Sequence, residues 1–261
     1  MTNITFDDEM GRLQRALAQC EDMVVRRSAV LDALNLRAGE RVLEVGCGGG
    51  FYAYEAAKFV GPKGRVAAID ISVDQIAAAR ERCAAFPWVE CQVANAADLP
   101  YGELEFDAAY GVQVIEYMID FGKALREIHR VLRPGGRFIN LATNFTSIVW
   151  HSAQPQRMRR VMDAFLAHAP YPDLPAILAP ALRKAGFQPI RQRAVPIVNT
   201  SYTENSFSTL VAKMIAGYVV GREAVTSEEA NDWLAEFAAL EESGEYFYSA
   251  TPIITEAIKV S

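Results

Sequence analysis

The sequence predicts an α/β fold with a mostly parallel sheet that carries helices on both faces. Three observations predict it. Short apolar runs alternate with helical periodicity from residue 41 to residue 142, a glycine-rich loop follows the first apolar run, and glycine or proline marks the boundaries. Strands that alternate with helices pair in parallel, because each helix returns the chain to the same edge of the sheet.

The first half of the chain gives the elements in a regular order. A helix is expected over residues 8–34, where leucine and valine recur near helical spacing until Asn35 and Gly39 close it. Ser72 is the expected N-cap of a later helix, and Pro134-Gly135-Gly136 stops the last one. The expected strands cover residues 41–45, 65–69, 89–93, 106–110 and 137–142, and the helices between them cover residues 52–60, 74–86 and 121–132.

After residue 143 this alternation loosens. A polar helix is expected over residues 146–169, and a second helix over residues 178–185, ended by Gly186. Alternating patterns predict strands over residues 188–198 and 245–259, the latter interrupted by Pro252. Between these strands lies a helical insertion over residues 204–242, rich in alanine, glutamate and aromatic residues.

Composition excludes several classes of function. A net charge of −6 leaves no basic stripe for nucleic acid, and Arg157, Arg159 and Arg160 are expected to form a solvated helix face. The four cysteines form no CxxC pair and match no zinc spacing, so we expect no metal site and a reducing, cytoplasmic setting. No signal-like segment or bilayer-length apolar stretch occurs, so no membrane partner is expected.

The segment most informative about chemistry is the loop at residues 46–50, which has four glycines in five positions. Glycine permits φ > 0 and close approach of the backbone to a ligand, and the N–H groups of such a loop form a polar cradle. Glu44 lies two residues before the first glycine. Its carboxylate would repel a pyrophosphate but suit a cation or a pair of hydroxyls, which favours S-adenosylmethionine over a dinucleotide.

Five motifs in order resemble the class I, seven-stranded S-adenosylmethionine-dependent methyltransferases, in particular the small-molecule group that includes the ubiquinone and menaquinone biosynthesis methyltransferases. Residues 44–50 match the ExGxGxG loop, and Asp70 ends the second strand. Residues 95–100 resemble the adenine loop, Phe106-Asp107 opens the fourth strand, and residues 132–136 precede the fifth. The resemblance covers residues 35–142 and implies a Rossmann-like sheet of seven strands with the last one antiparallel.

The resemblance also implies roles for individual residues. Asp70 would accept hydrogen bonds from the ribose hydroxyls, Ile71 would pack on adenine, and Asn95 would read the adenine edge at a position where the family usually has Asp. The full set of expected cofactor-binding residues is Glu44, Gly46, Cys47, Gly48, Asp70, Ile71, Gln75, Asn95, Ala96, Tyr110, Gly111 and Val112.

The expected catalytic residues are His151, Tyr117 and Glu116, any of which would act as a general base if the acceptor must lose a proton. Tyr117 stands where family members often carry His. The resemblance further implies a helical cap over residues 1–34 and a methyltransferase domain over residues 35–261, in which residues 204–242 are a lid or a homodimer contact.

Three functions remain open at this point. The first is methyl transfer from S-adenosylmethionine, giving S-adenosylhomocysteine, to a small molecule whose accepting atom (O, N, S or C) the sequence does not fix. The second is a nicotinamide-dependent oxidoreductase, although Phe51 occupies the third glycine position of GxGxxG. The third is a protein that binds S-adenosylmethionine without transferring its methyl group.

Overall fold

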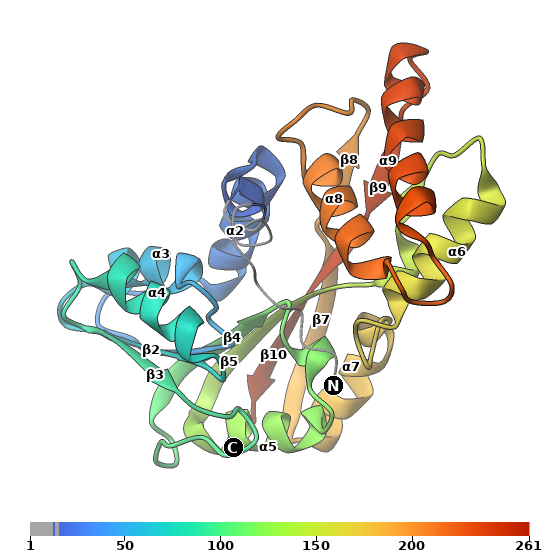
Figure 1. The fold of residues 1–261 in the computed structure, drawn as a ribbon. Helices are drawn as coiled ribbons and strands as arrows, with labels where there is room; N and C mark the ends of the chain where they lie inside the picture. The colour runs from blue at the N-terminus through green and yellow to red at the C-terminus, as the bar shows by residue number, and fades with distance from the viewer. Residues whose placement is uncertain (1–12, 14–15, 261) are drawn as a thin grey trace. The chain divides into compact units, whose positions relative to one another are not determined.

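The computed structural model describes residue 13 and residues 16–260. The chain divides into two compact units, whose helices and strands are labelled in Figure 1. The sheet unit comprises Arg27–Thr143, Asp173–Val195 and Pro252–Ser261, and the helical unit comprises Met1–Arg26, Asn144–Pro172 and Pro196–Thr251. The chain therefore passes twice from the sheet unit into the helical unit and back.

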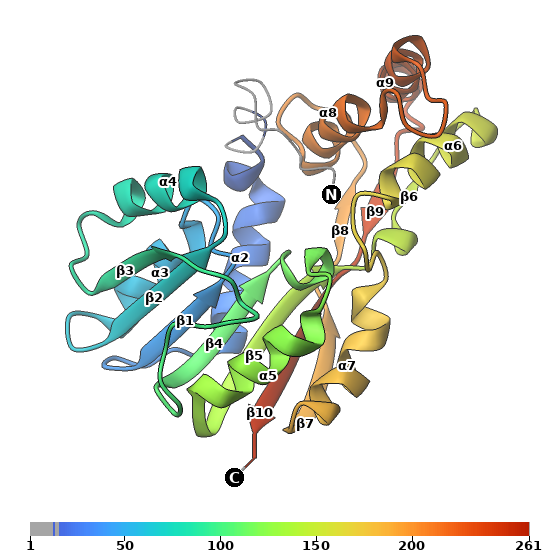
Figure 2. The same ribbon diagram turned by 60° about the horizontal axis from the view of Figure 1, so that its bottom comes forward.

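The sheet unit contains a seven-stranded sheet in the order β3-β2-β1-β4-β5-β10-β7. Strand β10 is antiparallel to both of its neighbours, β5 and β7, whereas the pairs formed by β1 to β5 are parallel (Figure 2). The predicted fold class is therefore confirmed. The strands are β1 (Arg41–Val45), β2 (Arg65–Asp70), β3 (Val89–Val93), β4 (Phe106–Val112), β5 (Leu132–Thr143), β7 (Phe187–Ala194) and β10 (Pro252–Lys259).

Helices cover both faces of this sheet. On one face, α2 (Glu21–Leu34), α3 (Phe51–Val60) and α4 (Val73–Cys83) share a hydrophobic core with Ala108 and Ile139 of the sheet. On the other, α5 (Phe121–Val131) and α7 (Leu174–Lys184) contact β5, where the Phe138 ring lies 5.9 Å from that of Phe187. Both faces are thus apolar, as a buried parallel sheet requires.

The helical unit is built on a small antiparallel sheet, β6 (Val149–Trp150), β9 (Tyr248–Ala250) and β8 (Ile197–Asn199), with α6 (Pro155–Leu166), α8 (Phe207–Val219) and α9 (Ser227–Glu242). Trp150 anchors its core. The Trp150 ring stacks on Phe237 at 5.5 Å and lies 4.5 Å from Tyr248, and its indole N–H donates to the Tyr246 hydroxyl at 3.1 Å.

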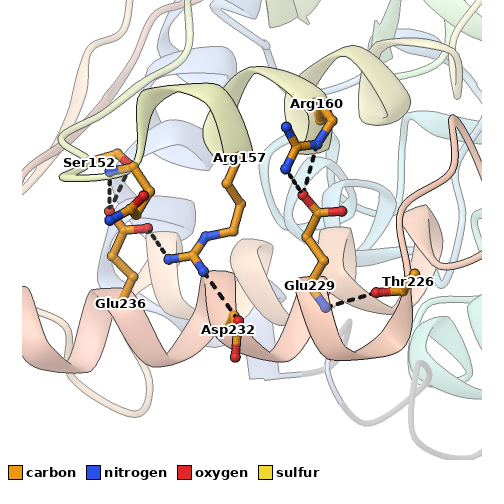
Figure 3. Close-up of polar contacts among 8 residues, drawn as sticks. Ser152, Arg157, Arg160, Thr226, Glu229, Asp232 and Glu236 are labelled. Carbon is orange, nitrogen blue, oxygen red and sulfur yellow. Dashed lines mark hydrogen bonds and ion pairs between the residues drawn. The ribbon is translucent and has the colours of Figure 1, made fainter.

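A polar seam joins α6 to α9 (Figure 3). The Arg157 guanidinium pairs with Glu236 at 2.8 Å, and Arg160 Nε donates to Glu229 at 2.8 Å. Glu236 also accepts from the Ser152 hydroxyl and from two backbone amides just before α6, which fixes the segment that leads into that helix. The expected solvated face is therefore wrong for Arg157, whose side chain is 19% exposed, whereas Arg160 pairs with α9 but remains exposed.

Sequence periodicity located most elements of the first half to within a few residues. Strand β5 is the exception, because it begins at Leu132 rather than at residue 137, so that Pro134-Gly135-Gly136 lies within this strand and α5 already ends at Val131. The helix expected over residues 74–86 ends earlier, at Cys83, and Ser72 caps its N-terminus as predicted, accepting from the Gln75 amide. The helix expected over residues 8–34 is interrupted, because residues 16–19 are helical, Cys20 is a bend and α2 begins at Glu21. Apart from residue 13, the part of it before residue 16 lies outside the described residues.

The second half differs more. Residues 146–169 are not one helix, since a 3-10 turn, η2 (Phe145–Ser147), and strand β6 precede α6, which begins at Pro155. The strand expected over residues 188–198 is two strands in different sheets, because Pro196 lacks a backbone N–H and lies between β7 and β8. The strand expected over residues 245–259 divides at Pro252 into β9 and β10, and the insertion is two helices, capped by Ser206 and Thr226.

Candidate functional site

The glycine loop lies between β1 and α3 and closes onto the end of β2. Gly46 has φ +68°, and a Cβ there would lie 2.2 Å from Val114 Cγ2, so only glycine fits. Gly48 has φ +50°, and of the atoms in the described part of the chain only Gln75 Oε1 would come within 4 Å of a Cβ there. The Cys47 amide donates to the Ile69 carbonyl at 2.9 Å. The loop is therefore held by β2 and leaves room at Gly48.

Asp70 at the carboxyl end of β2 is joined directly to this loop. Its Oδ2 accepts from the Gly48 amide at 2.9 Å, and its Oδ1 accepts from the Ser72 amide at 2.9 Å. A carboxylate oxygen has two lone pairs, so each oxygen can still accept from a ligand hydroxyl. The half-buried Asp70 is thus oriented by two backbone donors and retains acceptor capacity.

The predicted adenine loop follows β3 and lies beside Asp70. The Ala94 amide donates to the Asp70 carbonyl at 3.0 Å. Asn95 is exposed, and its Oδ1 accepts from the Ala97 amide at 2.9 Å, which fixes the turn. Ala96 is buried, 5% exposed. The structure therefore brings the loops after β1, β2 and β3 together at one edge of the sheet.

Large apolar side chains stand exposed on both sides of Asp70. Ile71 is 76% exposed and Val73 is 68% exposed, and Val93, which pairs with Asp70 across the strands, is 44% exposed. Exposed apolar side chains grouped beside a polar acceptor are typical of a binding site for a flat, partly apolar ligand. Val73 and Val93 were not among the expected site residues, and only their position at the strand ends could have indicated them.

Glu44 and Tyr110 are not on the surface of the loop. They pair across β1 and β4 inside the sheet, 2% and 0% exposed. Burial raises the pKa of the Glu44 carboxyl well above its usual range, and burial followed by the nearby Glu44 raises the pKa of Tyr110. Burial likewise raises the pKa of the Cys47 thiol, which keeps it protonated. The buried Glu44 lies on β1 just before the loop, and its direct contact with a ligand stays a prediction.

Gly111 and Val112 end β4 beside β5. A Cβ on Gly111 would lie 2.9 Å from Val114 Cγ1, so Val114 packs under both Gly46 and Gly111. Nothing in the sequence pointed to Val114. The next residue after β4, Gln113, has φ +53° and accepts from the Thr143 hydroxyl at 2.9 Å, which ties the ends of β4 and β5 together.

The three expected catalytic residues do not belong to one unit. Glu116 and Tyr117 lie on the 3-10 turn η1 (Ile115–Tyr117) of the sheet unit, where Glu116 is fully buried and Tyr117 is 40% exposed. His151 lies in the helical unit, is exposed, and donates its backbone amide to the Phe247 carbonyl at 2.9 Å. Their roles therefore stay predictions.

The described part of the chain contains neither a metal-binding cluster nor a helix that could span a membrane. Across residue 13 and residues 16–260, no group of His, Cys, Asp and Glu side chains is arranged to hold a metal ion. Within the same residues, every helix is too short or too polar to cross a membrane.

Comparisons with known proteins agree with this geometry. A family model described as a methyltransferase domain matches residues 43–140. A demethylmenaquinone methyltransferase of Symbiobacterium thermophilum is 37% identical over 110 residues, 41% of this chain and 44% of that protein. An uncharacterized 37.1 kDa protein in a transposon of Streptomyces fradiae is 39% identical over 132 residues, 51% of this chain and 38% of that protein. The chain thus matches less than half the length of either relative.

The fold is also similar to solved structures over most of the chain. The cyclase SpnF has a TM-score of 0.57 at 25% identity, covering 92% of this chain and 80% of that one. A putative methyltransferase from Bacillus halodurans has a TM-score of 0.61 at 18% identity, covering 90% of this chain and 99% of that one, and so shows the fold alone.

Proposed function

Because residues 43–140 form a methyltransferase domain of the class I, S-adenosylmethionine-dependent kind, we propose that the chain transfers a methyl group from S-adenosylmethionine to a small-molecule acceptor. The single observation that carries this proposal is the Asp70 carboxylate, held at 2.9 Å from the Gly48 amide at the carboxyl ends of β1 and β2. Ligands of open α/β sheets bind at these strand ends.

The residues at this edge fit the proposed cofactor. Asp70 would accept hydrogen bonds from the two ribose hydroxyls, and the exposed Ile71 and Val93 would pack against adenine. Asn95 and Ala96 would read the adenine edge. The backbone of Gly46, Cys47 and Gly48, with Gln75, Gly111 and Val112, would hold the methionine part, while the buried Glu44 and Tyr110 pair across β1 and β4 beneath the loop.

Bound S-adenosylmethionine supplies an electrophilic methyl group on a sulfonium, which is already a good leaving group. The chain must orient the acceptor, exclude water and, for some acceptors, remove a proton. We propose that Tyr117, Glu116 or His151 performs the last task. If one does, its Phe, Gln or Asn variant lowers kcat by about a hundredfold with unchanged cofactor affinity. A kcat equal to that of the wild-type chain in each of the three variants would mean that none of these residues is needed as a general base.

The remaining expectations are part of the same proposal. The setting is the cytoplasm, where the four free and buried thiols stay reduced, and neither nucleic acid nor a membrane is a partner. Residues 204–242, now α8 and α9, act as a lid, with a homodimer contact as the alternative. Limited proteolysis separates the two, because a lid loses cleavage sites when S-adenosylmethionine binds at fixed protein concentration, whereas a dimer contact loses them as protein concentration rises.

The test of the function is transfer itself. Methyl-labelled S-adenosylmethionine is incubated with the chain and a panel of hydroxyl, amine, thiol and activated-carbon acceptors, and label in the organic products is counted. Label in one acceptor class, lost in Asp70→Asn, supports the proposal. Cofactor binding with no transfer to any class would favour the second candidate below.

The second candidate is a domain that binds S-adenosylmethionine but catalyses no transfer. It is favoured by the similarity to the cyclase SpnF, which extends over 92% of this chain, far beyond the residues that the methyltransferase model matches. Conversion of a small-molecule substrate into a product without consumption of S-adenosylmethionine would identify this function.

A further inference from the structure

The helical unit contains a groove of about 680 Å³ lined by α6, residues 145–152 and Phe247. All of these segments belong to the helical unit, so the groove is complete within it. Small-molecule sites have volumes of roughly 300 to 1,000 Å³. The groove is therefore of a size that holds a small organic ligand.

One wall of the groove is an apolar stripe of α6. Met158, Met162 and Leu166 follow one another at four-residue spacing, which places them on one side of the helix. Elsewhere in the lining, Val149 is 50% exposed and Phe247 is 40% exposed. Flexible methionine side chains adapt to differently shaped apolar ligands. The body of the groove thus offers apolar surface that solvent now covers.

Arg159 also lines this groove and differs from its neighbours on α6. Arg157 and Arg160 are paired with carboxylates of α9 (Figure 3). Among the described residues, Arg159 makes no hydrogen bond or ion pair, although it is exposed and Asp163 lines the groove one turn further along. A guanidinium is permanently charged and presents donors that match a carboxylate, sulfonate or phosphate group.

We propose that this groove binds a small amphiphile whose apolar body lies on the Met158, Met162 and Leu166 stripe and whose acidic group pairs with Arg159. Arg159 is the one permanently charged cation among the described residues that line the groove, and it lies one helical turn nearer to the His151 and Ser152 end than Asp163 does. The acidic group of the ligand is therefore assigned to that end. This binding does not depend on the proposed function.

Two probes that share an aromatic body test the binding. Anilinonaphthalene sulfonate carries an anion, and phenylnaphthylamine has the same rings without it, and both fluoresce more strongly in apolar sites. The full chain is expected to bind the sulfonate about tenfold more tightly, as one charge-assisted contact gives. Arg159→Gln is expected to abolish the preference for the sulfonate without changing the affinity for phenylnaphthylamine. Asp163→Asn is expected to increase the preference for the sulfonate a few-fold.

The matched control is Arg160→Gln, on the same helix but paired with Glu229, which keeps the preference while lowering thermal stability. Equal affinity of the two probes for the wild-type chain, or an Arg159→Gln variant that keeps the preference, overturns the proposal. Methyl transfer without any sulfonate preference would refute the groove alone, and the sulfonate preference without cofactor binding would refute the proposed function alone.

Discussion

Replacing Asp70 by Asn separates the two roles that we assign to its carboxylate. In the structure the carboxylate accepts from the Gly48 and Ser72 amides, one with each oxygen. An Asn side chain keeps the shape but has only one acceptor oxygen, so one of the two amides then faces an NH₂ group. The variant therefore loses one internal hydrogen bond as well as the negative charge offered to a ligand.

These two losses have different sizes. A lost internal hydrogen bond costs about 1 kcal/mol of folding stability, which lowers Tm by about 2 to 4 °C in a chain of this length. Each ligand hydroxyl that donates to a charged acceptor contributes about 1.5 to 3 kcal/mol. Loss of one such contact weakens S-adenosylmethionine binding about 10- to 100-fold. Affinity is thus expected to fall much more than stability.

The assay is calorimetric titration of S-adenosylmethionine, with thermal unfolding of the same samples. Asp74→Asn is the matched control. Asp74 is an exposed acidic residue in the first turn of α4, and its replacement by Asn removes the same charge as Asp70→Asn does. It is expected to change affinity less than twofold. If Asp70→Asn binds within threefold of the wild-type chain, or if Asp74→Asn weakens binding equally, the carboxylate does not hold the ligand and the reasoning is refuted.

Three further changes test the site and the fold. Gly46→Ala places a Cβ 2.2 Å from Val114 Cγ2 at positive φ and should lower the free energy of unfolding in urea by about 2 to 5 kcal/mol. Gly39→Ala is also at positive φ, but beyond its chain neighbours none of the described residues comes within 4 Å of the added Cβ, so it should lose only about 1 to 2 kcal/mol. Equal losses would contradict the packing under the loop. Ile71→Ser should weaken S-adenosylmethionine binding about fivefold at unchanged Tm, since Ile71 is 76% exposed until a ligand covers it. Burial raises the pKa of the Glu236 carboxyl, but the hydrogen bonds that it accepts outweigh burial, so that its pKa in the folded chain is lowered. The stabilisation by Glu236 is therefore fully present above the unfolded carboxyl pKa of about 4.3 and is lost as the pH falls through the lower folded pKa. Glu236→Gln should therefore be less stable than the wild-type chain at pH 7, and the urea midpoints of the two should converge as the pH falls below the folded pKa of Glu236.

Local sequence signals were sufficient for the motif-bearing half of the chain. The strand expected over residues 41–45 is β1, and the one over residues 89–93 is β3, because short apolar runs bounded by glycine, proline or polar residues leave little choice of boundary. Ser72 was identifiable as a cap because a hydroxyl before a helical run satisfies its free amides. The meeting of Asp70 with the glycine loop follows from parallel pairing of β1 with β2.

The second half was less predictable because its contacts are long-range. Whether residues 188–198 form one strand or two depends on two different sheets, and only Pro196 gave a local hint. Arg157 and Arg160 are paired and Arg159 is not because of where α9 packs, and α9 lies about seventy residues later in the chain. Val114 had no local signal at all, since its importance lies in the space left by Gly46 and Gly111.

The measurement that tests the account most directly is a parallel calorimetric titration of the full chain with S-adenosylmethionine, S-adenosylhomocysteine and NAD. The account predicts one site that binds the first two, weakened at least tenfold by Asp70→Asn, and no binding of NAD at the same concentrations. Binding of NAD in preference to S-adenosylmethionine, or S-adenosylmethionine binding that Asp70→Asn leaves unchanged, would contradict it.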